Sequence, residues 1–390
     1  MSTLPARAAS QMASDVYLVK SENLDPSTNM DLELALDRNK QYFDLGIENK
    51  LEGKSGGLII NKTSGFGIVS KGKGAYSKDA FIILRGTATG YDVLTDLNAG
   101  FSSSTSNHAV HLGFNNTFKT LKPQLETFFA QQRETISTIH CIGHSLGGAL
   151  ATLAAEWAMQ TKKAAQVNLY TFGCPRVGIL SYTDYFENHT TCGGIYRAYH
   201  KTDPIPMVPI WPFVHLLEQD SYGLPSPGHY INPEYHRMVQ YINTIGSNDW
   251  GTLDSLYKDK VEDSAIEKWL ASDSFVSLTA NTIRLFSSAI GYVIRKVLKA
   301  IGITIQTVLG AATTLLDQLA YTLHRGLKAA EATSNWVMRL IKKMAKALGI
   351  VIQKGKSLTM QFIRYVLQAM SNHIRTLVQK AVDFVMQRVY

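Results

Sequence analysis

Short apolar runs recur through the first 245 residues, each bounded by polar or glycine-rich segments. Runs of this length predict buried strands, and the stretches at 118–133 and 147–161 that lie between them have the apolar spacing of helices. Strands that alternate with helices of this length favour a mostly parallel central sheet in an α/β fold. The predicted strands are 65–70, 80–84, 137–142, 167–172 and 195–199.

The pattern changes after Asp249 to continuous helical periodicity, and no proline follows Pro233. We therefore expect an α/β domain over residues 1–250 and an all-α region over 251–390. The longest uncharged run of this helical region, 300–316, has 17 residues. A spanning helix needs about 20 predominantly apolar residues, so a permanent transmembrane helix is disfavoured. The apolar stripes of the region are Ile283, Phe286, Ile290, Val293 and Val297; Trp336, Leu340, Met344 and Leu348; and Ile363, Val366, Met370, Ile374 and Leu377.

Composition and charge separate these two parts further. With 45% hydrophobic and 18% charged residues, the chain is not a disordered protein, a collagen or a polytopic membrane protein. The net charge of +8 is unevenly distributed, because residues 271–390 hold sixteen Lys and Arg but four Asp and Glu. The tail therefore carries +12 and the first 270 residues carry −4. Such asymmetry points to a membrane surface or a nucleic acid as the partner of the tail.

Basic amphipathic helices of this density suit an anionic lipid surface, which is our first hypothesis for the tail. The alternative is a helical bundle whose stripes form its own core and whose lysines are solvated. A nucleic-acid partner is not expected, because no aromatic stacking platform accompanies the charge. The basic residues concerned are Arg295, Lys296, Lys299, Arg339, Lys342, Lys343, Lys346, Lys354 and Lys356.

Three cysteines are too few for a disulfide scaffold, and no Cys/His ladder predicts a metal site. The first 20 residues lack the apolar core of a secretory signal peptide. We therefore expect a protein that is made in the cytoplasm and, if it leaves the cell, is exported by a specialised system.

The sharpest chemical signal is Gly143-His-Ser-Leu-Gly147, between a predicted strand and a predicted helix. Glycines at both ends let the strand and the helix approach closely, so that Ser145 is presented on a sharp turn as a nucleophile. The amide of Leu146, at the start of the helix, is the nearest donor for an oxyanion.

A nucleophilic serine needs a base and an acid, which follow it along the chain in this fold. Asp203, just after the strand 195–199, is the predicted acid. His215, His229 and His236 are the candidate bases. We prefer His236, which begins a helical stretch, with His229 next and His215 last.

Several segments, in order along the chain, resemble those of the class 3 lipases, the Rhizomucor-type family with an α/β-hydrolase fold. Together they cover about residues 60–245. The segments are Leu84-Arg-Gly-Thr87, Tyr91-Asp-Val-Leu-Thr-Asp-Leu97, Val110-His-Leu-Gly-Phe114, the elbow through Ala151, Thr171-Phe-Gly-Cys-Pro-Arg-Val-Gly178, and Asp203-Pro-Ile-Pro206 with His236.

The resemblance implies that Thr87 is a second oxyanion residue beside Leu146, that 89–97 form a lid, and that no metal or cofactor is needed. It also implies a membrane phospholipid or a glyceride as the substrate. Without a signal peptide and with a lipid-seeking tail, the chain fits an antibacterial effector that is delivered by a secretion machine and restrained by an immunity protein. The alternatives are an intracellular triacylglycerol or diacylglycerol lipase that docks on lipid through its tail, and a non-catalytic scaffold.

Overall fold

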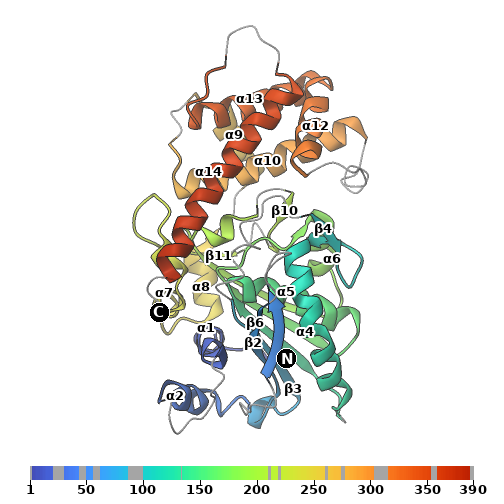
Figure 1. The fold of residues 1–390 in the computed structure, drawn as a ribbon, viewed down its shortest axis with the longest axis vertical. Coiled ribbons are helices and arrows are strands. Elements are labelled where there is room, and N and C mark those ends of the chain that lie inside the picture. Colours follow the sequence, from blue (N-terminus) through green and yellow to red (C-terminus); the bar gives the residue numbers. More distant parts are fainter. Residues whose placement is uncertain are drawn as a thin grey trace.

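An α/β part and a helical part make up the fold, with the helices above the sheet in Figure 1. The computed structural model describes residues 2–20, 30–43, 50–55, 62–86, 100–132, 134–209, 212–217, 221–259, 262–273, 277–302, 315–352 and 358–386.

The α/β part is built on a central sheet of eight strands in the order β1-β2-β3-β6-β7-β9-β11-β12. The five strands from β3 to β11 in this order are parallel, whereas β1, β2 and β12 pair antiparallel at the two edges. The expectation of a mostly parallel sheet in an α/β fold is thus confirmed. The strands are β1 (Lys50–Ser55), β2 (Lys62–Lys71), β3 (Asp79–Leu84), β6 (Thr138–His144), β7 (Gln166–Phe172), β9 (Cys192–His200), β11 (Ser221–Leu224) and β12 (Lys258–Asp259).

Helices cover both faces of this sheet because its strands are apolar on both sides. Along β3, Ile82 and Leu84 join the core under α4 and α5, while Phe81 and Ile83 join the core under α1 and α7. This alternation follows from the two-residue period of a strand. The helices of this part are α1 (Ala6–Asp15), α2 (Met30–Asn39), α4 (Leu112–Ala130), α5 (Leu146–Gln160), α6 (Leu180–Glu187), α7 (Met238–Ile245) and α8 (Trp250–Tyr257), with short 3-10 turns η1 (Val16–Lys20), η4 (Gly74–Tyr76), η6 (Ile205–Met207) and η7 (Pro233–His236).

A second, antiparallel sheet of four short strands lies beside the central one, in the order β10-β8-β5-β4. No strand in it is longer than three residues, so the apolar runs of the sequence did not predict it. The strands are β4 (Phe101–Ser103), β5 (Ala109–His111), β8 (Gly178–Ile179) and β10 (Phe213–Val214).

The expected helical region is confirmed in the described residues from Asp263 onward, but strand β12 lies inside the range 251–390 that we expected to be all-α, because it extends the edge of the central sheet. The apolar stripes of the helical part are not exposed. The five stripe residues of α10, from Ile283 to Val297, are each at most 2% exposed, and Leu340 and Met344 of α13 are fully buried. The stripes therefore form the core of a helical bundle, the alternative to a lipid-facing surface. Its helices are α9 (Asp263–Ala271), α10 (Ala280–Ile301), α12 (Leu315–Leu327), α13 (Glu331–Ala347) and α14 (Met360–Met386).

Lys343, which we expected at a lipid surface, is also buried, and its Nζ donates to the carbonyl of Ser272 at 2.6 Å. Lys354 and Lys356 lie outside the described residues. Within the described ranges, no helix combines the length and the apolar character that a membrane span requires.

The helical part packs on the edge of the sheet where the parallel strands end. There α10 contacts η6, and α14 extends from the bundle to contact η7 (Figure 1). Apolar side chains of α10 and α14 share one continuous core with Ile205, Met207 and Val208. The bundle therefore covers the two segments that follow β9 and β11.

We predict that Leu340→Ala destabilises the bundle by about 2–5 kcal/mol, because it leaves a cavity in a closed core. Urea unfolding measured by circular dichroism tests this, with Val351→Ala, at a position 84% exposed, as the control. Equal losses of stability in the two variants would contradict the assignment of this stripe to a core.

Candidate active site

Ser145 occupies a sharp turn between β6 and α5, with backbone angles φ 57° and ψ −132°. A non-glycine residue with positive φ is uncommon, and such strain typifies a nucleophile elbow. The turn closes only because its flanks are glycines. A Cβ at Gly143 would lie 2.1 Å from the carbonyl oxygen of Gly147, and a Cβ at Gly147 would lie 2.2 Å from that of Leu84.

Asp203 lies in the turn after β9, and its side chain is fully buried. Its Oδ2 accepts hydrogen bonds from His236 Nδ1 at 2.8 Å and from the Tyr241 hydroxyl at 2.6 Å. Its Oδ1 accepts from the amide of Ile205 at 2.9 Å. Three donors on one carboxylate compensate for its removal from water and fix its orientation.

His236 is the last residue of η7 and is 3% exposed. Because its Nδ1 bonds to Asp203, its Nε2 is the nitrogen left to accept a proton. That Nε2 is buried, and no residue in the described ranges hydrogen-bonds to it. Of the three candidate bases, the structure thus places His236 against the predicted acid.

The other two candidates have different surroundings. His215 bonds through Nε2 to the carbonyl of Pro206 at 2.7 Å, and burial together with Arg197 and Arg176 holds its pKa well below the usual range. His229 is exposed, and its carbonyl accepts a hydrogen bond from the amide of Ala280.

His144, the residue before Ser145, contacts the candidate base His236 through its ring and a hydrogen bond. Its ring lies 4.5 Å from that of His236, and its Nε2 bonds to the His236 carbonyl at 2.7 Å. Its Nδ1 bonds to the hydroxyl of Tyr17 at 2.7 Å, and that oxygen also accepts from the amide of Gly86 at 3.1 Å. Burial and the neighbouring His236 hold the His144 pKa well below its usual range, so the ring is a neutral connector.

Tyr17 and the Tyr241 hydroxyl were not among the predicted site residues. Tyr17 lies 128 positions before Ser145, and no local motif indicates this pairing. Burial raises the pKa of Tyr17 to about 12, so its hydroxyl stays a donor.

Of the two predicted oxyanion residues, the structure describes Leu146. Leu146 begins α5 and is buried, so its amide is at the positive end of the helix beside Ser145. A Cβ at Gly86 would lie 3.1 Å from Ser145 Cβ, which brings the end of β3 to the elbow. Thr87 and the expected lid, 89–97, lie outside the described residues.

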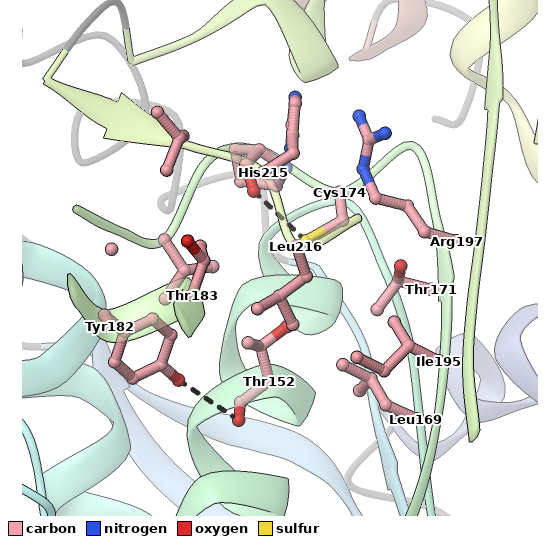
Figure 2. Close-up of a pocket in the computed structure, with 14 residues that line it drawn as sticks. Thr152, Leu169, Thr171, Cys174, Tyr182, Thr183, Ile195, Arg197, His215 and Leu216 are labelled. Atoms are coloured by element: carbon pink, nitrogen blue, oxygen red, sulfur yellow. Dashed lines mark hydrogen bonds between the residues drawn. The ribbon is translucent and has the colours of Figure 1, made fainter. Parts of the chain in front are cut away.

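No described set of His, Cys, Asp and Glu could hold a metal ion. A small cavity lies beside the elbow helix, where Cys174 packs against Gly148 and Thr152 and Leu169 form the walls (Figure 2). Burial raises the pKa of the Cys174 thiol to about 12, so it is not a thiolate nucleophile. The pairing of His236 with Asp203 next to the elbow of Ser145 suits proton transfer from a serine through an imidazole held by a carboxylate.

The chain is similar to known lipases in part of its length. The family model "Lipase (class 3)" matches residues 81–213. A secreted mono- and diacylglycerol lipase of Fusarium solani is 30% identical over 174 residues, 43% of this chain and 50% of that protein. Toxin TseL of Vibrio cholerae is 30% identical over 122 residues, 30% of this chain and 18% of the toxin. The chain therefore spans at most half the length of these two relatives.

Among solved structures, the triacylglyceride lipase of Rhizomucor miehei is 22% identical, and the match covers 56% of this chain and 78% of that one with a TM-score of 0.41. A lipase from Rhizopus microsporus var. chinensis is also 22% identical, over 57% of this chain and 73% of that one, with a TM-score of 0.40.

We predict that Tyr241→Phe lowers the free energy of unfolding by about 1–3 kcal/mol and slows labelling of Ser145 by a fluorophosphonate, because Asp203 loses one buried donor. Urea unfolding and the rate of labelling measure the two effects. Tyr230→Phe, at a position 67% exposed, is the control. An unchanged labelling rate would show that the Tyr241 hydroxyl does not hold the acid.

Proposed function

We propose that this chain, which belongs to the class 3 lipase family across residues 81–213, is a serine ester hydrolase that acts on membrane lipids. The observation that carries the proposal is the buried 2.8 Å bond between His236 Nδ1 and Asp203, adjacent to the strained elbow at Ser145. Within the described residues, the Nε2 of His236 has no hydrogen-bond partner, which suits a base that accepts the proton of a serine.

In the proposed mechanism, His236 Nε2 takes the proton of Ser145 as its Oγ attacks the ester carbonyl. The amide of Leu146, with Thr87 as its proposed partner, stabilises the oxyanion. Asp203 holds the imidazole in the required tautomer and stabilises its protonated form. His236 then protonates the leaving alcohol, and water releases the acyl group by the same route.

We infer a phospholipid as the first candidate substrate, in an antibacterial effector with an immunity protein as its partner. The similarity to a toxin and the basic helical extension support this proposal. The second candidate is a mono- or diacylglyceride, which the similarity to the secreted Fusarium lipase favours.

We predict that purified protein releases fatty acid and lysophospholipid from mixed vesicles of phospholipid and triacylglycerol, and that Ser145→Ala abolishes this release. The variant removes the nucleophile, and the loss should be on the order of 10⁴-fold or more. Mass spectrometry of the products is the measurement.

Each outcome selects one function. Release from triacylglycerol alone would favour a glyceride lipase over the phospholipase. Release that persists in Ser145→Ala, or fluorophosphonate labelling at another residue, would overturn the assignment of the nucleophile. No release of fatty acid from either lipid would favour the alternative that the protein is a non-catalytic scaffold.

We also propose that the exposed basic residues of the bundle bind an anionic membrane. Their positions support this, because Arg339 lies 4.9 Å from the ring of Trp336, which is partly exposed, and Lys296 lies on the surface above the buried ring of Tyr292. Basic and aromatic side chains together are typical of proteins that bind at lipid interfaces. The exposed basic residues of α10 and α13 are Arg295, Lys296, Lys299, Arg339, Lys342 and Lys346.

We predict that the double variant Lys296→Glu/Arg339→Glu binds vesicles of phosphatidylcholine and phosphatidylglycerol at least about tenfold more weakly, since each basic residue near an anionic surface contributes about 1 kcal/mol. Co-sedimentation in a Ser145→Ala background measures binding without hydrolysis. The control is Lys78→Glu/Lys162→Glu, two exposed lysines in turns before β3 and β7. Equal binding by the two double variants would contradict a docking role for α10 and α13.

A further inference from the structure

Arg284 of α10 connects the helical bundle to the strand that leads to Asp203. Its Nη2 donates to the hydroxyl of Tyr199, near the end of β9, at 2.6 Å. The same guanidinium forms an ion pair with Asp259 of β12, and that carboxylate also accepts a hydrogen bond from Tyr199. Three elements that are distant in sequence thus meet at one partly buried carboxylate.

The side chains around Tyr199 and Asp259 are closely packed. The Tyr199 ring lies 4.6 Å from the guanidinium carbon of Arg197 and 4.9 Å from that of Arg284. A Cβ at Gly223 on β11 would lie 2.7 Å from Asp259 Oδ2, so a larger residue there would displace the carboxylate. Burial opposes ionisation of Asp259, but Arg284 and the Tyr199 hydroxyl bring its pKa below the usual value, so the pair is charged at neutral pH.

The cluster lies directly beside the acid. Tyr199 precedes the turn in which the amide of Asp203 donates to the carbonyl of His200 at 3.0 Å. A cavity of about 30 Å³ is lined by Arg284 and Ser288 from the bundle and by Asp203 and Met207 from the acid's segment. Arg197 lines this cavity and the one drawn in Figure 2. The cavity has room for about one or two waters. Because Arg284 and Asp203 both line so small a cavity, Arg284 lies close to the segment that carries Asp203.

The segment that leads to the candidate base His236 also contacts the helical bundle. The amide of Ala280, one turn before Arg284 on α10, donates to the carbonyl of His229 at 2.9 Å. Helix α14 contacts η7, which ends at His236. The segments that carry the acid and the base are therefore both packed between the sheet and the bundle.

We propose that Arg284 is a positioning residue of the hydrolase site, through which the helical region holds the β9 end and the turn of Asp203 in register with His236. The inference rests on the proposed function. It makes the bundle part of the catalytic unit as well as a lipid-binding extension. Arg284 acts through Tyr199 and touches neither Ser145 nor the ester.

The test compares full-length Arg284→Met and Arg284→Lys with wild type on a short, soluble ester. We expect kcat of Arg284→Met to fall about 10- to 100-fold, because a small displacement of the acid misaligns the proton acceptor, whereas KM changes less than about twofold. Arg284→Lys keeps the ion pair and should regain part of kcat. The rate of fluorophosphonate labelling should fall in parallel, since it reports the reactivity of Ser145 without an acyl pocket.

Two further variants separate positioning from stability. Lys71→Gln removes an exposed ion pair with Glu134, outside the bundle, and should leave kcat unchanged. Tyr199→Phe removes the connecting hydroxyl but keeps the ring between the two guanidinium groups, and it should lower kcat in a chain that still folds. Circular dichroism and the melting temperature establish the folded fraction of each variant.

The outcomes distinguish this inference from the function on which it rests. Wild-type kcat in both Arg284→Met and Tyr199→Phe would overturn the inference and leave the hydrolase standing. A loss of kcat that only follows the unfolded fraction would also overturn it. A wild-type protein that neither hydrolyses the ester nor reacts with the fluorophosphonate would overturn the proposed function and, with it, this inference.

Discussion

The close approach of β6 to α5 at Ser145 is the constraint on which the remaining structure depends. Gly143 and Gly147 pass within a distance that no Cβ could occupy, and the strain of a positive φ at Ser145 persists because the sheet and α5 are packed on both sides. Since the neighbouring strands are parallel, their carboxyl ends meet at the same edge. The acid, the base and the elbow are therefore brought together by topology.

Bringing these groups together removes them from water, and the fold must then supply their hydrogen bonds. Asp203 receives three donors, and the neutral ring of His144 is bonded at both nitrogens. A half-satisfied buried network costs more than an apolar core, so Tyr17 and Tyr241 are needed as hydrogen-bond partners of His144 and Asp203. The same requirement extends to the bundle, whose residue Arg284 compensates the charge of Asp259 beneath α10.

Local patterns in the sequence predicted the central strands and the sharp turn at Ser145, because each depends on residues that are close together in the chain. The choice of His236 as the partner of Asp203 depended on its place at the start of a helical stretch and on a family motif, and the two side chains are hydrogen-bonded. Tyr17 could not be predicted, since its role is defined by contacts with Gly86 and His144 that exist only after folding. The strands of the second sheet are too short to produce a pattern. For the helical stripes the period was correct, but an apolar stripe gains similar free energy from lipid or from another helix, so periodicity alone cannot identify the partner.

Helix α10 unites the two roles that we propose for the bundle. The face of α10 toward the sheet carries Arg284 against Tyr199, and its exposed face carries Lys296. Twelve residues separate the two, about 18 Å along the helix axis. Because a helix transmits displacement as a rigid body, a membrane that binds the basic face acts on the same element that holds the acid's segment. The two proposals therefore place the lipid-binding face and the support of the Asp203 segment on one helix.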